Sequence, residues 1–404
     1  MTVVVLLLGS ACGGGGGASQ ENSAAHTTTA TTTAGGSERA SEAALDAALK
    51  KSFKESGAPG IVAAVQTPEY RWVGTRGVED LASKKPMAAD VHQRIGSVTK
   101  TFTVSLLLQA QADGLLSLDD TIDKYVDGIP NGDKITLRQM ANMTSGIASY
   151  TLDDQWQNEL FSDPKRVWTP EELVQVAIKD SPAFDPGTQW QYSNSNTILL
   201  GLVLQKVSGK PIGELYREKI LGPLGLRGTS FPNAADSSLP EPHAQGYTLQ
   251  GKSGGEPANA TDWNPSWAWT AGGMISTLDD LLVYGRALGT GEGLLPPKQQ
   301  AERLDSFLTN GPSPNNHDRA YGLGLGQERG WLGHTGELPG FNTAVYYHRA
   351  LDATVVVEVD SDIPSGHCPA DQPTMTDSPH DVPCADPASR IFGALAEALG
   401  KPVV

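Results

Sequence analysis

The hydrophobic periodicity of this 404-residue chain changes along its length, and this change limits the possible folds more than any other feature. Residues 60–66 and 70–74 predict a hairpin of short strands, and residues 334–348 and 353–359 alternate like paired strands. Between these regions, up to about residue 319, short helical stretches are broken by Pro and Gly. Strands at both ends and helices between them predict one sheet built from both ends of the chain, with a helical subdomain inserted.

Three longer patterns predict helices around this sheet. They cover residues 37–55 with Ser37 as the cap, residues 97–112, and residues 387–399. We expect residues 38–404 to form one interlocked domain, preceded by a separate segment at 1–37. Its α/β part is predicted at about 38–115 and 320–404, and its helical part at about 116–319.

The first 37 residues have the composition of a processing signal and a tether. A short apolar run ends in the small residues Gly9, Ser10 and Ala11, and Cys12 follows directly. This order resembles a bacterial lipobox, in which the cysteine becomes the lipidated N-terminus; the alternative is a small-residue linker that contains a cysteine. The Gly- and Thr-rich stretch that follows predicts a flexible spacer. We expect an exported protein, lipid-anchored to the outer face of the cytoplasmic membrane.

The remaining two cysteines, Cys368 and Cys384, enclose a loop rich in Pro and Asp. A disulfide is favoured there if the protein is exported and disfavoured if it stays in the cytoplasm. Export of the protein and pairing of these two cysteines therefore both predict a location outside the cytoplasm.

Charge and hydropathy exclude several classes of protein. The chain has 46 acidic and 30 basic residues, a formal net charge of −16, which disfavours binding to nucleic acid. The mean hydropathy is −0.28, and no apolar run approaches the roughly 20 residues that span a bilayer, which excludes a multi-spanning membrane protein. The eight histidines and three cysteines show no metal-ligand spacing, so we expect no metal and no cofactor.

Ser97 and Lys100 carry the first chemical signal. They lie three residues apart at the start of an apolar helix, so both side chains emerge on one face within a turn. A serine hydroxyl needs an adjacent base to become a nucleophile. Either a desolvated, neutral Lys100 or a neighbouring phenolate could accept its proton. Ser162 and Lys165 repeat the spacing, but their polar surroundings are typical of an ordinary helix end.

Two further motifs follow in order along the chain. Tyr192 and Asn194, separated by one residue, lie before the apolar run at 198–204. His334, Thr335 and Gly336 open the predicted strand pair near the C-terminus. The order of a nucleophile helix, a Tyr-x-Asn loop and a basic residue with Thr-Gly on a strand resembles that of the penicillin-recognising serine hydrolases. These are the class C β-lactamases, the secreted D-alanyl-D-alanine carboxypeptidases and related esterases.

The resemblance covers about residues 40 to 400 and implies both a fold and a set of roles. The implied fold is α/β (α+β), an antiparallel sheet flanked by helices with an inserted all-helical subdomain. Ser97 would be the acylated nucleophile, Lys100 and Tyr192 would share acid–base work, and His334 would replace a lysine found in many relatives. By the same resemblance, Asn194, Thr335 and Gly336 would bind the acyl group, and the amides of Ser97 and Glu337 would form the oxyanion hole.

The residues that should bind a substrate carboxylate depart from the carboxypeptidase pattern. Gly326 occupies the position where that branch has an arginine, and Glu337 replaces a frequent threonine. Arg329 lies three residues beyond Gly326 and is the candidate substitute. Trp267 and Trp269 are expected to line the cleft, with core packing as the alternative for either one.

Three hypotheses about function follow. The first is an envelope serine hydrolase of the D-alanyl-D-alanine carboxypeptidase or β-lactam-hydrolysing type. The second is an esterase or amidase for small acyl substrates, and the third is a non-catalytic lipoprotein that binds peptidoglycan fragments. Under the first two, the partner is a small-molecule or peptide acyl substrate, and we expect a monomer. Residues 251–255 imitate the Gly-x-Ser-x-Gly elbow of other hydrolases, but their polar context predicts a loop.

Overall fold

Both ends of the described chain contribute strands to one seven-stranded antiparallel sheet. The computed structural model describes residues 41–369, 372–375 and 381–403. The strand order across the sheet is β2-β1-β11-β10-β9-β8-β7. The strands are β1 (Gly60–Gln66), β2 (Arg71–Gly77), β7 (Arg319–Tyr321), β8 (Gly326–Glu328), β9 (Trp331–Leu338), β10 (Phe341–His348) and β11 (Ala353–Val359).

The central pairing joins β1 from the N-terminal region to β11 from the C-terminal region. Ala64 lies opposite Val356 in this antiparallel ladder, and β1 also pairs with β2 as the predicted hairpin. Strands β10 and β11 are buried on both faces, because helices cover both sides of the sheet. The predicted sheet built from both ends of the chain is confirmed.

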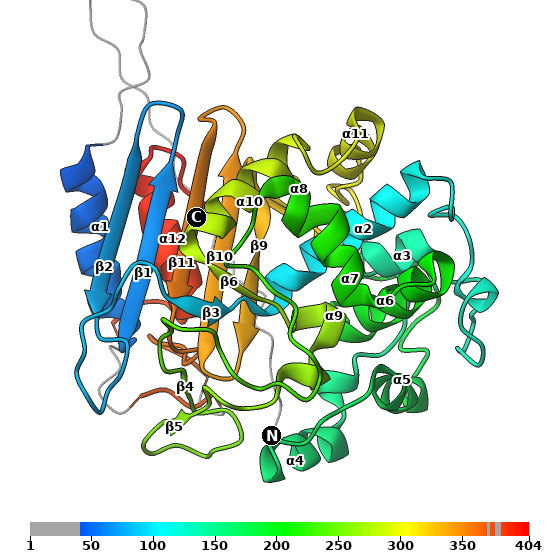
Figure 1. Ribbon diagram of the computed structural model, residues 1–404, viewed down its shortest axis with the longest axis horizontal. Coiled ribbons are helices and arrows are strands. Elements are labelled where there is room, and N and C mark those ends of the chain that lie inside the picture. Colours follow the sequence, from blue (N-terminus) through cyan, green and yellow to red (C-terminus); the bar gives the residue numbers. More distant parts are fainter. Residues whose placement is uncertain (1–40, 370–371, 376–380, 404) are drawn as a thin grey trace, which may run out of the picture.

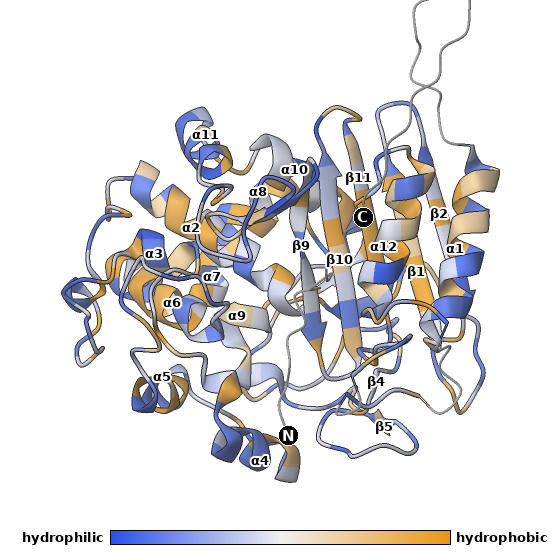
Figure 2. Ribbon diagram, turned by 180° about the vertical axis from the view of Figure 1, so that it is seen from behind, coloured by the Kyte–Doolittle hydropathy of each residue, from blue (hydrophilic) through white to orange (hydrophobic). Residues whose placement is uncertain are grey.

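Helices form a layer on each face of the sheet. Helices α1 (Glu42–Ser56) and α12 (Pro387–Ala398) pack side by side on the face seen in Figure 2. Leu45 and Leu49 of α1 and Ile391 and Leu395 of α12 are fully buried in the apolar core beneath them. Helix α10 (Leu278–Thr290) covers the opposite face, in front of β10 and β11 in Figure 1.

The first helix starts later than the sequence pattern predicts. Its N-cap is Ser41, whose side chain accepts a hydrogen bond from the Ala44 amide. The predicted cap Ser37 lies outside the described residues. Helix α12 is observed within one residue of its predicted end.

The remaining helices form a region beside the sheet, on the right in Figure 1. Its centre is the contact between α2 and α6, whose apolar side chains are largely buried. The predicted division of the domain at about residues 115 and 320 stays a prediction. The helices are α2 (Thr99–Ala112), α3 (Leu137–Ala141), α4 (Asp154–Ser162), α5 (Pro170–Lys179), α6 (Asn194–Ser208), α7 (Ile212–Tyr216), α8 (Gly222–Leu224), α9 (Trp269–Gly272) and α11 (Pro297–Asp305).

Two small strand pairs lie outside the main sheet. One joins β3 (His92–Arg94) to β6 (Ile275–Thr277), and the other joins β4 (Tyr247–Thr248) to β5 (Ala258–Asn259). The pair β3–β6 links the segment before Ser97 to the segment after α9, so it helps to hold the turn that carries Ser97 against that helix.

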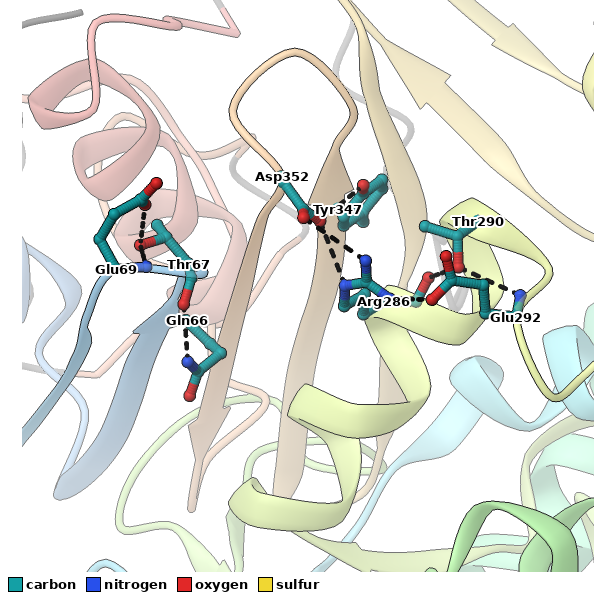
Figure 3. Close-up of polar contacts among 8 residues, drawn as sticks. All are labelled: Gln66, Thr67, Glu69, Arg286, Thr290, Glu292, Tyr347 and Asp352. Carbon is teal, nitrogen blue, oxygen red and sulfur yellow. Dashed lines mark hydrogen bonds and ion pairs between the residues drawn. The ribbon is translucent and has the colours of Figure 1, made fainter.

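Polar contacts fasten α10 to the turn between β10 and β11. Figure 3 shows Arg286 of α10 and Tyr347 of β10 converging on Asp352 in this turn. Arg286 Nε lies 3.2 Å from Asp352 Oδ1, and the Tyr347 hydroxyl donates to the same oxygen at 2.8 Å. This turn lies between the two strands predicted at 334–348 and 353–359, and its side chains also position the helix layer.

Candidate active site

Ser97 and Lys100 lie where the nucleophile turn enters α2. Ser97 belongs to a single 3₁₀ turn, Gly96–Val98, and Lys100 is in the first turn of the helix. Their shared helix face brings Lys100 Nζ to 2.8 Å from Ser97 Oγ. The carbonyl oxygen of Ala271, from α9, accepts a second hydrogen bond from Nζ at 2.6 Å. The predicted pairing of these two side chains is present.

Burial controls the charge of Lys100. The side chain is 0% exposed, and no carboxylate of the described residues forms an ion pair with it. Burial lowers the pKa of Lys100 well below its usual range, because a buried ammonium loses its hydration. A neutral amine keeps a lone pair, and a neutral Lys100 can therefore accept the proton of the Ser97 hydroxyl.

Tyr192 completes the inner part of the site from the loop before α6. Lys100 Nζ lies 4.9 Å from the centre of its ring. Burial raises the pKa of Tyr192, opposed by its interaction with Ser97 and reinforced by the nearby charge of Glu337. The hydroxyl is buried and makes no hydrogen bond of standard geometry with the described residues. It therefore remains protonated and available to an incoming group.

Asn194 stands at the first position of α6 and faces the same cleft. Its side-chain amide donates to Thr151 Oγ1 at 3.1 Å, and its backbone amide donates to Ser149 Oγ at 3.1 Å. These two bonds fix the end of the helix and the orientation of the amide.

Strand β9 brings Thr335, Gly336 and Glu337 to the nucleophile turn. A side chain at Gly336 would collide with the Ile95 carbonyl oxygen, and its Cβ would lie 3.1 Å from the Ser97 amide nitrogen. Only glycine permits this approach. The backbone amides of Ser97 and Glu337 are thus neighbours, and Thr335 and Glu337 line the cleft.

His334 is neutral near pH 7. Its Nδ1 is bonded to the Thr335 carbonyl, which can only accept, so Nδ1 carries the proton. Its Nε2 then accepts from the Tyr321 hydroxyl at 3.1 Å. Burial lowers the pKa of His334 to about 4, and Lys100 acts in the same direction when it is protonated. His334 occupies the expected place on the strand without supplying a positive charge.

The aromatic residues around His334 were not predicted from the sequence. The ring centres of Tyr321 and His334 are 5.7 Å apart, and those of Tyr192 and Tyr321 are 6.3 Å apart. Trp190 packs against Tyr321 from the other side. Tyr321 belongs to a segment that the resemblance includes, but no local pattern assigns it to the site; Trp190 has no signal of its own.

These residues open into a cleft of about 1440 Å³. Trp267 lines it as predicted and packs against Trp156, with ring centres 5.5 Å apart. The Trp267 carbonyl accepts from the Tyr150 hydroxyl at 2.6 Å. Trp269 follows the alternative of core packing, because its ring lies against Gly201 of α6 and it is not among the residues that line this cleft. Close packing of α9 on α6 takes this side chain into the core.

The structure also locates most of the remaining residues that the sequence singled out. Arg329 lines the cleft and pairs with Asp318 at 3.3 Å. Cys368 and Cys384 form a disulfide, whereas Cys12 lies outside the described residues. Residues 251–255 form a loop with no helix after it, as expected.

Membrane and metal signals are both absent from the part of the chain that the structure describes. No described helix combines the length and the apolar composition that crossing a bilayer requires. No three His, Cys, Asp or Glu side chains of residues 41–369, 372–375 and 381–403 are grouped so that they could hold a metal ion.

A seryl nucleophile with a buried lysine beside it, set between an antiparallel sheet and a helical region, defines a serine hydrolase. The Beta-lactamase family model matches residues 45–371, and the chain belongs to this family.

Relatives of known name share much of the chain. The D-aminopeptidase of Cereibacter sphaeroides is 26% identical over 352 residues, which cover 85% of this chain and 64% of the relative. Penicillin-binding protein 4* of Bacillus subtilis is 22% identical, with 80% of this chain and 74% of the relative covered. The chain thus spans less than two thirds of the length of the D-aminopeptidase.

Solved structures show the same fold. A D-stereospecific amidohydrolase from Streptomyces sp. is 35% identical with a TM-score of 0.73, over 80% of this chain and 95% of that chain. The D-amino acid amidase from Ochrobactrum anthropi SV3 has the same TM-score at 24% identity, over 89% and 98% of the two chains. The expected fold class is therefore confirmed.

Proposed function

We propose that this protein hydrolyses amide bonds of small acyl or peptidyl substrates through an acyl-enzyme on Ser97. The observation that carries the proposal is the 2.8 Å contact between Ser97 Oγ and a fully buried Lys100 that has no described counter-ion. A charged surface lysine at the same spacing would have no lone pair to offer the hydroxyl.

The first half of the reaction transfers the acyl group to serine. Neutral Lys100 takes the Ser97 proton while Oγ attacks the carbonyl carbon. The amides of Ser97 and Glu337 stabilise the oxyanion that forms. The proton then reaches the leaving nitrogen from Lys100, directly or through the Tyr192 hydroxyl, and the amine departs. Water then attacks the acyl carbon as Lys100 takes its proton. Lys100 returns a proton to Ser97 Oγ as the ester bond breaks, which frees the acid and restores Ser97.

The directions of two pKa shifts support Lys100, and not a Tyr192 phenolate, as the base. Burial lowers the pKa of Lys100 and raises that of Tyr192, so burial favours both the neutral amine and the protonated phenol. A phenolate base would require the opposite order.

An amidase is favoured over a D-alanyl-D-alanine carboxypeptidase or a β-lactamase by the charges around the cleft. A terminal carboxylate requires a cation, yet Arg329, the candidate for this role, is paired with Asp318. The names of the D-aminopeptidase and the D-stereospecific amidohydrolase support the same choice. The carboxypeptidase and penicillin-binding function remains the second candidate, supported by the relation to penicillin-binding protein 4*.

We also propose the exported, lipid-anchored location, with Cys12 as the anchor. The disulfide between Cys368 and Cys384 supports an oxidising compartment. A monomer stays a prediction; one solved relative, from Pyrococcus abyssi, is described as octameric.

One experiment separates these candidates. Purified protein is incubated with a labelled penicillin, an aryl ester and an aminoacyl anilide, and intact mass and turnover are followed for wild type, Ser97→Ala and Ser162→Ala. We expect anilide turnover in wild type and Ser162→Ala, and none in Ser97→Ala. A persistent penicillin adduct without anilide turnover would favour the penicillin-binding candidate. Activity retained in Ser97→Ala would contradict the proposed nucleophile.

A further inference from the structure

Carboxylates are concentrated at the β9 end of the cleft, next to the nucleophile. Glu337 follows directly after the glycine that touches the Ser97 turn, and Asp386 lines the same cleft from the start of α12. Behind them, Gln250 donates through one nitrogen to Glu337 Oε1 at 3.0 Å and to Asp362 Oδ2 at 2.7 Å. Gln250 therefore holds the Glu337 side chain in position without neutralising it.

Asp386 occupies a capping position but does not act as a cap. The free amide of Ala388 in the first turn of α12 is satisfied instead by Asn342 Oδ1 at 2.8 Å. The half-buried Asp386 carboxylate lines the cleft and forms no hydrogen bond and no ion pair with any described residue. An unpartnered carboxylate in a cleft indicates a ligand that can donate to it.

Every described cation that lines the cleft is already engaged elsewhere. Arg319 pairs with Glu328, and Arg329 pairs with Asp318. Arg390 donates to the carbonyls of Pro383 at 2.7 Å and Ser365 at 2.8 Å. Lys51 lies 3.9 Å from Glu55. The cleft thus presents acidic side chains to the substrate and keeps its basic side chains engaged.

The electrostatics of this corner favour an incoming cation. Burial and the neighbouring charges of Asp386 and Asp362 raise the pKa of Glu337 well above its usual range. Burial, together with Asp362, raises the pKa of Asp386 to about 6. The groups facing them are Gln250, Asp362, Arg390 and the protonated Tyr192, and Arg390 is the only described cation that opposes the shift of Asp386. An ammonium placed here would restore the ionised carboxylates.

We infer that Glu337 and Asp386 form a subsite for a protonated amino group on the acyl part of the substrate. The class of substrate is an aminoacyl amide, or a peptide cleaved after its N-terminal residue, with a free amine next to the scissile carbonyl. The inference rests on the proposed acyl-Ser97 reaction and names its substrate. Glu337 can contact both the scissile carbonyl and the neighbouring amine of such a substrate, because its backbone amide lies at the oxyanion position and its side chain faces the cleft. The aromatic side chains of Trp156 and Trp267 line the same cleft and offer a surface for the substrate's own side chain.

The test compares substrates that differ only in the amino group. These are D-phenylalanine p-nitroanilide, its N-acetyl derivative and 3-phenylpropionyl p-nitroanilide. The readout is the ratio of kcat/KM for the free amine to kcat/KM for the des-amino analogue. We expect a ratio of about 100 or more in wild type, and a ratio lowered at least tenfold in Glu337→Gln and by a smaller factor in Asp386→Asn.

Glu397→Gln is the matched control, since Glu397 is an exposed carboxylate that lines the far part of the same cleft. Its ratio should equal that of wild type. A variant that merely damages the fold lowers kcat/KM for both substrates and leaves the ratio unchanged, which is why the ratio is measured.

Three negative results are possible, and they do not all have the same meaning. Equal kcat/KM for the free amine and the des-amino analogue, with Ser97 still acylated, would overturn the ammonium subsite alone. An unchanged ratio in both Glu337→Gln and Asp386→Asn would also overturn it. Absence of acylation by all three anilides and by the aryl ester would overturn the proposed function itself.

Discussion

Two Ser-x-x-Lys sequences in this chain have the same spacing and opposite surroundings. Lys100 is fully buried and 2.8 Å from Ser97 Oγ. Lys165 has a side chain that is 65% exposed and pairs with Asp262, while the Ser162 hydroxyl donates to the Glu159 carbonyl at the end of α4. Spacing alone therefore does not make a nucleophile. The difference lies in which element carries the serine and in how much water reaches the lysine.

The largest expected difference between the two lysines is in turnover. Lys100→Met should lower kcat for amide hydrolysis by about 10³-fold, because no other described amine approaches Ser97. Lys165→Met, the matched control, should retain wild-type kcat. The measurement is steady-state hydrolysis of the anilide by both variants. Equal losses of kcat in the two variants would contradict the prediction that only the buried Ser97–Lys100 pair is catalytic.

The second difference is in pH dependence. Because Lys100 must be neutral to accept a proton, kcat/KM should fall about tenfold per pH unit below its lowered pKa and level off above it. His334, with a pKa of about 4, adds no step near pH 6.5. Lys165→Met should show the same profile as wild type. A profile that rises only near the ordinary lysine pKa would show that Lys100 is hydrated in solution.

The smallest expected difference is in the free energy of unfolding. Lys100→Met should raise this free energy although it lowers activity. The folded pKa of Lys100 lies below the unfolded value, so between these values the unfolded chain binds more protons and stability rises with pH. Lys100→Met removes the free-energy cost of burying an amine that is protonated in the unfolded chain. The substitution also leaves the Ala271 carbonyl without its hydrogen-bond donor. We expect a net gain of about 1 kcal/mol in the free energy of unfolding at pH 7 and a flatter pH dependence.

The exposed pair again provides the control. Lys165→Met should change the free energy of unfolding by less than about 1 kcal/mol, because solvent screens the pair with Asp262. Urea unfolding of both variants at pH 6, 7 and 8 measures the two effects. A Lys100→Met protein that is strongly destabilised at all three pH values would contradict the proposed cost of burying this lysine.

Local features of the fold were predictable because they depend on neighbouring residues. The strand at 60–66, the strand at 353–359 and the final helix follow from periodicity and turn residues, and their bounds match closely. The pairing of Ser97 with Lys100 follows from helix geometry in the same way. In each case the relevant residues lie within one or two turns or one strand of each other.

Features that depend on distant segments were not predictable. Asp386 reaches the cleft only because α12 packs on the sheet, and Tyr321 meets His334 only through the pairing of short edge strands. The orientation of Trp269 depends on how closely α9 approaches Gly201. No local pattern contains this information, because it arises from the register and packing of elements that are far apart in sequence.

The sheet that joins both ends of the chain also sets the order in which the enzyme can mature. Ser97 and Glu337 are separated by 240 residues. Strand β9 pairs with β10, β10 pairs with β11, and β11 pairs with β1. The oxyanion position cannot exist until Val359 has been synthesised and β11 has paired with β1. A chain still being synthesised therefore holds its serine without the strand that contributes the second oxyanion amide. Hydrolysis begins only when the last strand is in place.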